Sequence, residues 1–271
     1  MPSGLRALVL AGDRRERDAL AEQGGVAHKA LLEVAGVPML VRVVRTLAAL
    51  PRIGFIQVST GSAALLDAHA ELAARRADGL LRHHASAGSP AASVEDAVAS
   101  LPAGSPLLVT TADHPLLSPA MVEHFCDAAE RSGAAVAAAV VPESVIRARF
   151  PDVRRTFIPL RGEAITGANL FWFASAEAAA AARFWRRTEE VRKQPWRLAA
   201  LFGPGVWLRF AARRLALDDV TQELSRRIGL PVAAVRLPFA ECGLDVDRPA
   251  DLRLAERLLD AAPGAASPSG A

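Results

Sequence analysis

The stretch that decides the fold is LLVTTADHPLLSPAMV, residues 107–122. The apolar run Pro106–Thr111 predicts a buried strand, because aliphatic residues follow one another almost without a break. Asp113 follows at the carboxyl end of that strand, and Ser118 is expected to N-cap the next helix through its hydroxyl. A second apolar strand is expected at Ala135–Val141. The stretch therefore predicts a β-α-β unit that presents a carboxylate where its first strand ends.

The same alternation of strands and helices continues on both sides of this unit. Further strands are expected at Ala7–Leu10, Phe55–Val58, Thr156–Leu160, Leu170–Phe173 and Val232–Leu237. Helices are expected at Met39–Leu50, Ala63–Arg76 and Pro249–Leu259. Strands linked by helices in this order favour parallel pairing, with helices on both faces of the sheet. The sequence therefore predicts an α/β fold, a Rossmann-like three-layer α/β/α arrangement around a mostly parallel sheet.

A helical insert interrupts this alternation. Residues from about 175 to 230 read almost entirely as helix. Because strands are expected before and after the insert, both sides should contribute to the same sheet. We expect residues 1–262 to form a single domain and the tail, residues 263–271, to be disordered, since the tail is rich in Pro, Gly, Ser and Ala.

Within this insert, residues 183–217 interleave Trp and Phe with Arg and Lys. One reading is a helical hairpin that packs an apolar face on the sheet. A second is an interfacial surface that makes peripheral contact with a membrane and serves a lipid-linked acceptor. A third is a homodimer interface or a lid over the acceptor. The sequence leaves these readings open.

The bulk composition indicates a globular protein with a sizeable core. The 271 residues are 51% hydrophobic and 23% charged. The formal net charge of +3 is too small to argue for binding to nucleic acid. Neither Cys126 nor Cys242 stands in a disulfide or metal motif. The first apolar run, about six residues long, is too short for a signal peptide, so a cytoplasmic location is expected.

The first strand leads into a candidate phosphate site. The strand ends at Ala11 and Gly12, and small residues there let backbone N–H groups approach a phosphate closely. Lys29 follows the polar loop, and its ammonium would neutralise polyphosphate charge. The plainer reading is a surface loop with a solvated lysine.

Three aspartates are candidate metal ligands. Asp113 stands at a strand end, where ligands bind in open α/β sheets, and Mg²⁺ prefers oxygen ligands. Asp245 and Asp247 are expected on an extended segment, so their carboxylates should point the same way and need a cation or donor between them. The plainer readings are a turn-capping Asp113 and an Asp247 that N-caps the last helix.

Two further segments are candidates for substrate contacts. Gly88 and other small residues precede a helix, and Ser93 is expected either to cap that helix or to contact a base. Gly167 and Asn169 are expected to precede an apolar strand, where the asparagine amide would contact an acceptor. The plainer reading of this second pair is a turn.

Four of these segments follow known motifs in a known order. The run HKALLEVAGVPML corresponds, from Lys29 onward, to the pattern K-x-L-x-x-x-x-G-x-P-M-L. Ala112–Leu116 corresponds to G-D-x-P-L, Gly167–Phe171 to G-x-N-x-Y, and Asp245–Leu252 to D-x-D-T-P-E-D-L. Together, over an α/β pattern, the four motifs resemble the MobA-like NTP transferases.

This resemblance covers residues 5–174 and 232–260 and implies both a fold and an activity. The fold would be of the nucleotide-diphospho-sugar transferase type. The activity would be nucleotidyl transfer, in which the phosphate of a small acceptor attacks the α-phosphorus of an NTP, with CTP or GTP favoured, and pyrophosphate leaves. Mg²⁺ would be the cofactor, and the partners would be the NTP and the phosphorylated acceptor.

The resemblance also implies roles for particular residues. Lys29, Asp113 and Asp247 would be catalytic, and the two aspartates would hold Mg²⁺. Such a site acts by positioning and electrostatics rather than through a covalent nucleophile. The residues implied to bind the nucleotide and acceptor are Leu10, Ala11, Gly12, Arg14, Lys29, Gly88, Ser93, Gly167 and Asn169.

The loop AGDRRERDALAEQGG departs from the family pattern. Asp13 stands where the family has a second glycine, and Arg14, Arg15 or Arg17 would replace the arginine of the missing G-x-R-x-G. This departure keeps open a catalytically impaired nucleotide-binding protein. A second alternative is a metal-dependent glycosyltransferase of related fold, with the D-V-D sequence at 245–247 as its DxD motif. The lysine motif argues against it, because a sugar transferase needs no lysine beside an NTP triphosphate.

Overall fold

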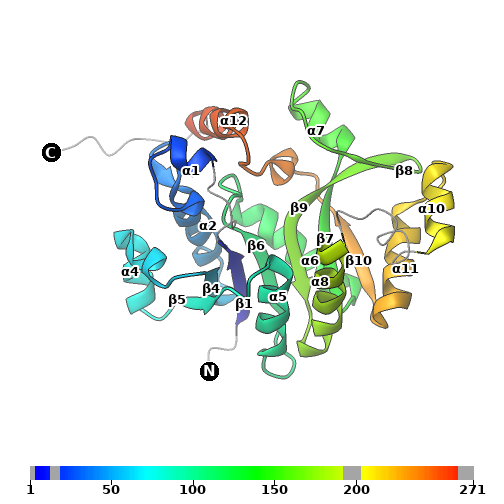
Figure 1. Ribbon diagram of the computed structural model, residues 1–271, viewed down its shortest axis with the longest axis horizontal. Coiled ribbons are helices and arrows are strands. Elements are labelled where there is room, and N and C mark those ends of the chain that lie inside the picture. Colours follow the sequence, from blue (N-terminus) through cyan, green and yellow to red (C-terminus); the bar gives the residue numbers. More distant parts are fainter. Residues whose placement is uncertain (1–3, 13–18, 192–202, 262–271) are drawn as a thin grey trace.

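Eight strands form one sheet in the computed structural model of the chain, which describes residues 4–12, 19–191 and 203–261 (Figure 1). The strands are β1 (Leu5–Leu10), β4 (Ile53–Thr60), β5 (Leu81–Ala85), β6 (Leu107–Thr111), β7 (Val136–Pro142), β8 (Ile158–Leu160), β9 (Glu163–Phe173) and β10 (Val232–Arg236). Their order is β10-β7-β9-β6-β1-β4-β5, with β8 paired to β9. Only the pairs that involve β9 are antiparallel. The prediction of a mostly parallel sheet is confirmed.

The helices connect these strands. They are α1 (Ala19–Gln23), α2 (Met39–Ala48), α3 (Ala64–Asp67), α4 (Ala70–Ala77), α5 (Pro90–Ala99), α6 (Pro119–Ser132), α7 (Glu143–Arg149), α8 (Ala179–Val191), α10 (Pro204–Ala211), α11 (Leu217–Ile228) and α12 (Pro249–Asp260). Short 3₁₀ turns are η1 (Lys29–Leu31), η2 (Ala176–Ala178) and η3 (Ala240–Gly243), and a small hairpin joins β2 (Glu33–Val34) to β3 (Val37–Pro38).

The central strand β1 shows how the sheet separates two hydrophobic cores. Successive side chains of a strand point to opposite faces, so Ala7 and Val9 join one buried cluster while Leu8 joins another. Side chains of α2 and α6 complete the first cluster, and side chains of α5 and the start of α8 complete the second. Helices therefore cover both faces of the sheet, and the predicted three-layer fold is confirmed.

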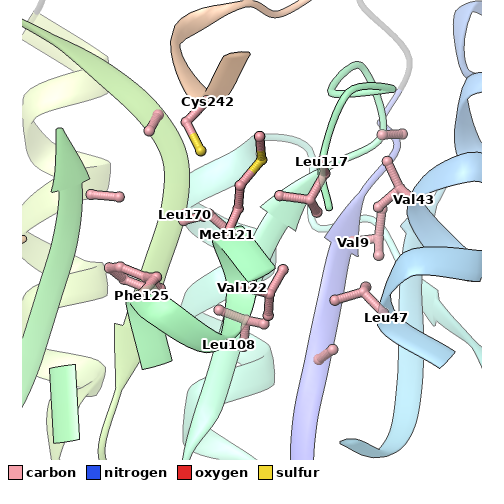
Figure 2. Packing of buried hydrophobic residues seen from close by; sticks show 14 of the residues in the cluster. Val9, Val43, Leu47, Leu108, Leu117, Met121, Val122, Phe125, Leu170 and Cys242 are labelled. Carbon is pink, nitrogen blue, oxygen red and sulfur yellow. The ribbon is translucent and has the colours of Figure 1, made fainter. Parts of the chain in front are cut away.

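The first core fixes the helix that follows Asp113. Figure 2 shows Met121, Val122 and Phe125 of α6 packed over the sheet near Leu108 of β6 and Leu170 of β9. A fully buried side chain of this size contributes about 1.5–3 kcal/mol to stability. Because β6 and α6 are held together in this way, the turn between them has a fixed position at the sheet edge.

Most predicted elements are confirmed, with shifts of a few residues at their ends. Ser118 caps α6 by accepting a hydrogen bond from the Met121 amide. The predicted helix Ala63–Arg76 is wrong as a single helix, because His69 adopts an extended conformation and caps α4 separately from α3. The hairpin β2–β3, strand β5 and helix α7 were not predicted. The β5 sequence LRHHA has no apolar run that could have revealed it.

The helical insert lies between β9 and β10. Since β10 pairs in parallel with β7, the strands on both sides of the insert belong to one sheet, as predicted. Helix α8 packs along α5, and Trp185 lies against Phe171 with ring centroids 5.0 Å apart. The reading of an apolar face packed on the sheet is therefore confirmed for α8. Trp196 and Phe202 lie outside the described residues.

No described helix combines the length and the apolar character needed to cross a bilayer.

Candidate active site

Three side chains from distant parts of the chain meet in one cluster. The Lys29 ammonium donates hydrogen bonds to Asp247 Oδ1 at 2.7 Å and to Asp113 Oδ2 at 3.2 Å. The lysine side chain is only 14% exposed, so its charge lies in a largely buried environment. Carboxylate bonds to an ammonium are among the stronger hydrogen bonds in proteins. The three residues that the motifs single out as catalytic are therefore brought together.

Local backbone structure holds each member in place. Lys29 begins η1, whose preceding residue His28 caps the turn by accepting a bond from the Ala30 amide. Asp113 lies two residues after the end of β6, and its carbonyl accepts a hydrogen bond from the Val246 amide at 2.9 Å. That bond joins the segment before α12 to the end of β6. As a result, Asp113 and Asp247 reach the same lysine although they are far apart in the sequence.

The start of α12 corrects one prediction. Asp247 is not the N-cap, because the cap residue is Arg248. The Asp251 carboxylate instead accepts bonds from the Asp247 and Arg248 amides, at 3.3 and 3.0 Å. The helix end is thus satisfied by a residue of its own first turn, and the Asp247 carboxylate points to the lysine.

The electrostatics of the cluster favour a charged lysine. Burial alone would lower the pKa of Lys29, but Asp113 and Asp247 outweigh it and raise that pKa above its ordinary value. Asp113 Oδ1 is buried and has no hydrogen-bond partner among the described residues. A buried carboxylate oxygen without a partner is costly, so this atom has unused capacity to accept a cation or a hydrogen bond.

His114 supports the turn rather than the chemistry. Its side chain is buried, and burial lowers the pKa of the imidazole. Its Nε2 lies 3.3 Å from the carbonyl oxygen of Glu241 in the η3 turn. The neutral ring therefore ties the Asp113 turn to η3 and leaves the carboxylate as the charged group there.

The donor set fits a hard cation. Two carboxylates face the lysine, and Mg²⁺ is commonly held by one or two carboxylates together with substrate phosphates and water. Among the described residues, no group of three or more His, Cys, Asp or Glu side chains forms a complete metal cage.

The residues after β1 lie next to the Asp113 turn, at the same edge of the sheet. The Leu10 carbonyl accepts a bond from the Ala112 amide, and the Ala11 amide donates to the Ser59 carbonyl at 2.9 Å. The Ala11 amide is therefore used within the sheet, and a contact of the Ala11–Gly12 backbone with the nucleotide stays a prediction. Gly12 is exposed, close to Ser86. Arg14 lies outside the described residues.

The loop before α5 differs in detail from its prediction. Ser89, not Ser93, is the N-cap of α5. Ser93 is buried within the helix, and its hydroxyl accepts a bond from the Ala87 amide at 3.0 Å. Gly88 has a φ of +86°, which favours glycine because other residues have a Cβ clash there. Ser93 therefore shapes the 86–88 turn, and a direct contact with a base stays a prediction.

Gly167 and Asn169 lie inside β9, not before a strand as predicted. Ala138 pairs with Phe171 and Val140 with Gly167, so β9 advances four residues where β7 advances two. Asn169 stands in this bulge with a φ of +50°, a conformation that asparagine tolerates better than most residues. Irregular backbone of this kind is frequent next to active sites.

Asp245 has a different partner from Asp247, and sequence reasoning missed that partner. Arg155 binds the Asp245 carboxylate through one terminal nitrogen and the Asp245 carbonyl through the other, at 2.8 Å for the carbonyl. The expectation that Asp245 and Asp247 point the same way, with one cation or donor between them, is corrected, because Asp245 binds Arg155 and Asp247 binds Lys29. The segment before α12 is not a strand, so the alternation of side chains does not apply to it. No local pattern marks Arg155, which lies in the loop between α7 and β8.

An open, mostly parallel sheet that collects a lysine and two aspartates at its carboxyl edge is typical of α/β proteins that bind a ligand at that edge. The family description "MobA-like NTP transferase domain" matches residues 7–220 of the chain. The chain belongs to this family.

Solved structures give the same fold. A hypothetical transferase from Thermus thermophilus is 32% identical, with a TM-score of 0.76, and the match covers 92% of this chain and 99% of the other. A 4-diphosphocytidyl-2C-methyl-D-erythritol synthase from Anaerococcus prevotii is 12% identical, with a TM-score of 0.59 and coverage of 96% and 100%. The chain has the nucleotide-diphospho-sugar transferase fold.

A third neighbour is a CMP:2-keto-3-deoxy-manno-octonic acid synthetase complexed with CTP. It is 15% identical, with a TM-score of 0.58, and the match covers 95% of this chain and 99% of the other. A search among curated proteins found no match. The family and the structural neighbours indicate an enzyme of the nucleotidyltransferase type.

Proposed function

We propose that the protein is a Mg²⁺-dependent nucleotidyltransferase that transfers a nucleoside monophosphate from CTP or GTP to a phosphorylated acceptor. The observation that carries this proposal is the Lys29 ammonium bound to Asp113 and Asp247 at the carboxyl edge of the sheet. A lysine beside two carboxylates supplies opposite charges for the two partners of such a reaction, a polyphosphate and a metal ion. Family membership supports the same class of reaction.

The reaction would proceed by in-line displacement. An oxygen of the acceptor phosphate forms a bond to the α-phosphorus of the NTP, and the bond from that phosphorus to the bridging oxygen of the β-phosphate breaks. The electron pair leaves with pyrophosphate. Lys29 would stabilise negative charge on the transferring phosphoryl group, and Gly12 would provide close backbone approach to the nucleotide.

Asp113 and Asp247 would hold Mg²⁺, and the buried Asp113 Oδ1 without a partner supports this assignment. When bound, the ion would neutralise the charge of the phosphate oxygens and help orient them. A lysine ammonium has three N–H donors. Lys29 directs two of them to the carboxylates, so the third would be the one to reach a phosphate.

The identity of the base and acceptor is inferred from chemistry and from the neighbours. Two of the structural neighbours carry a cytidine nucleotide in their names, which supports CTP as the first NTP to test. Gly88, Ser93, Gly167 and Asn169 stay the predicted substrate contacts, with Ser93 acting through the turn that it holds. A phosphorylated sugar or alditol is the proposed acceptor class.

The insert keeps three predicted roles. Its α10 leaves the Leu208 side chain 71% exposed. Residues 183–217 stay the surface proposed for a membrane-borne acceptor, for a second copy of the chain, or for a lid over the acceptor. A cytoplasmic location likewise stays a prediction.

A pyrophosphate-release screen tests the proposal. Each of four NTPs is offered with phosphorylated sugars, alditols, cofactors and lipid phosphates, with Mg²⁺ and with EDTA. We expect release that needs both an acceptor and the metal. No release with any pair, together with no rise in melting temperature with NTP and Mg²⁺, would contradict the proposal and favour an impaired binding protein. Release of a nucleoside diphosphate from a nucleotide sugar would indicate a glycosyltransferase.

A further inference from the structure

Arg155 is a buried cation that belongs to none of the motifs. Its side chain is 14% exposed, as little as that of Lys29. It lies in the loop 150–157, where Phe150 is buried and Phe157 packs against the same core. In the sequence this loop precedes the helical insert and Asp245 follows it. Only the folded chain therefore brings Arg155 and Asp245 together.

The contact with Asp245 has two parts. One terminal nitrogen of Arg155 donates to the Asp245 carboxylate, and the other donates to the Asp245 carbonyl. The next residue, Val246, donates its amide to the Asp113 carbonyl. The amide of Asp247 then donates to Asp251. The segment 245–247 is therefore fixed at every residue, and its last carboxylate is the one that reaches Lys29.

The contact with Arg155 gives Asp245 a different partner from Asp247, whose carboxylate binds Lys29. The charges of Asp113, Asp245 and Arg155 all act on the pKa of the buried His114 imidazole, so the three side chains lie in the same neighbourhood. Without Arg155, Asp245 would be an additional carboxylate near the region proposed to receive a triphosphate. It would repel the phosphates and offer the cation a competing ligand.

We propose that Arg155 is a positioning residue for nucleotidyl transfer: by binding the side chain and the carbonyl of Asp245, it excludes that carboxylate from the Lys29 cluster and holds Asp247 in the cluster. This inference rests on the proposed function. Groups that orient metal ligands in this way commonly contribute about 10–100-fold to metal affinity or activity.

Four variants test the inference: Arg155→Met, Arg155→Lys, Asp245→Asn and the double variant Arg155→Met with Asp245→Asn. Arg155→Met should lower kcat/KM for the NTP by about 10–100-fold and weaken Mn²⁺ binding by a similar factor. The Mn²⁺ affinity is measured by electron paramagnetic resonance in the presence of CTP, without acceptor or turnover. Arg155→Lys keeps the charge but loses the two-pronged contact, and it should fall between the native protein and Arg155→Met.

The double variant distinguishes two roles of Arg155: exclusion of the Asp245 carboxylate from the cluster and structural support of the loop. If Arg155 acts by excluding a carboxylate, the double variant should have a kcat/KM and a Mn²⁺ affinity at least tenfold higher than those of Arg155→Met. If Arg155 only supports the loop, the double variant should be no better than Arg155→Met, and the proposal is overturned. A loss of twofold or less in Arg155→Met also overturns it.

Controls separate this inference from general damage and from failure of the proposed function. Arg52→Met removes another partly buried arginine, one that binds Asp127 and Glu130 on α6 away from the cluster, and it should leave Mn²⁺ affinity unchanged. Melting temperatures show whether each variant folds; if Arg155→Met does not, Arg155→Lys alone, compared with its combination with Asp245→Asn, gives the same decision. Mn²⁺ binding with the expected pattern but no turnover would refute the proposed function and leave the role of Arg155 standing. Absence of Mn²⁺ binding in the native protein would refute both.

Discussion

Two charge clusters in this molecule have similar burial and opposite composition. In the first, Lys29 binds the carboxylates of Asp113 and Asp247. In the second, on helix α11 of the insert, Glu223 binds Arg226 at 2.7 Å and Arg227 at 2.5 Å. The central side chains are 14% and 12% exposed, so burial does not distinguish the two clusters.

Sequence separation and unused capacity distinguish them. The partners of Glu223 are three and four residues away, which is the spacing that any helix brings together. The partners of Lys29 are 84 and 218 residues away, and one oxygen of Asp113 has no partner among the described residues. The comparison supports the proposal that the first cluster binds a ligand, whereas the second stabilises a helix.

The largest expected effect comes from removing a carboxylate of the first cluster. Asp113→Asn should lower the rate of pyrophosphate release by about 1000-fold or more, because a metal ligand supports several kcal/mol of charge stabilisation. The matched change in the second cluster, Glu223→Gln, should leave that rate within about twofold. Steady-state assays of both variants test the distinction. Near-native activity in Asp113→Asn would remove the metal assignment.

The next effect concerns the lysine. Lys29→Met should raise the KM for the NTP and lower kcat, with a combined loss of about 100-fold, because a charge that contacts the phosphates is lost. Arg227→Met provides the control in the insert and should retain native kcat/KM. An unchanged affinity for the NTP in Lys29→Met would contradict the phosphate role.

Lys29 also predicts a pH dependence of stability. The pKa of Lys29 in the folded protein is raised above the unfolded value of about 10.4. Its contribution to the free energy of unfolding is therefore fully present below that pH and is lost as the pH rises through the folded pKa. The difference in unfolding free energy between native protein and Lys29→Met, measured without metal, should therefore be constant from pH 7 to 9 and shrink only above about pH 10.4. A difference that disappears below pH 9 would contradict the geometry.

A smaller effect is expected where the insert meets the sheet. Trp185→Ala should reduce the free energy of unfolding by about 2 kcal/mol, because it removes a large partly buried side chain and its contact with Phe171. Leu208→Ala, at an exposed position, should change stability by less than about 0.5 kcal/mol. Chemical denaturation of both variants measures the difference. Equal effects would mean that α8 is not the docking helix of the insert.

The smallest effect is expected for the stability of the second cluster. Glu223→Gln should lower stability by about 1 kcal/mol, since it weakens two charged hydrogen bonds within one helix. For a protein of this size the melting temperature should fall by roughly 2–4 °C. Melting curves of this variant and of Asp113→Asn, with and without Mg²⁺, show whether the two clusters differ as proposed. Mg²⁺ should raise the melting temperature of Glu223→Gln, in which the first cluster is intact, but not that of Asp113→Asn.

Much of the fold could be predicted because its signals are local. Ser118 caps a helix with its own hydroxyl, and the apolar run after Pro106 forms a strand in any context that buries it. Strand β5 was missed because it has no such local signal. Its own residues include an arginine and two histidines, and it is a strand because it pairs with β4. Ser93 and Ser89 are equivalent as caps by residue type, and only the position of the helix start decides between them.

The sequence by itself determined the α/β class, most of the strands along the chain, and the lysine and aspartates of the candidate site, because hydrophobic period and short motifs are properties of neighbouring residues. The tertiary structure alone decided which cation each aspartate meets. Asp245 and Asp247 stand on an irregular segment whose side chains follow no period, so their partners depend on Arg155 and Lys29, which reach them from other parts of the chain. Long-range contacts of this kind form only once the sheet has brought those loops to the same edge.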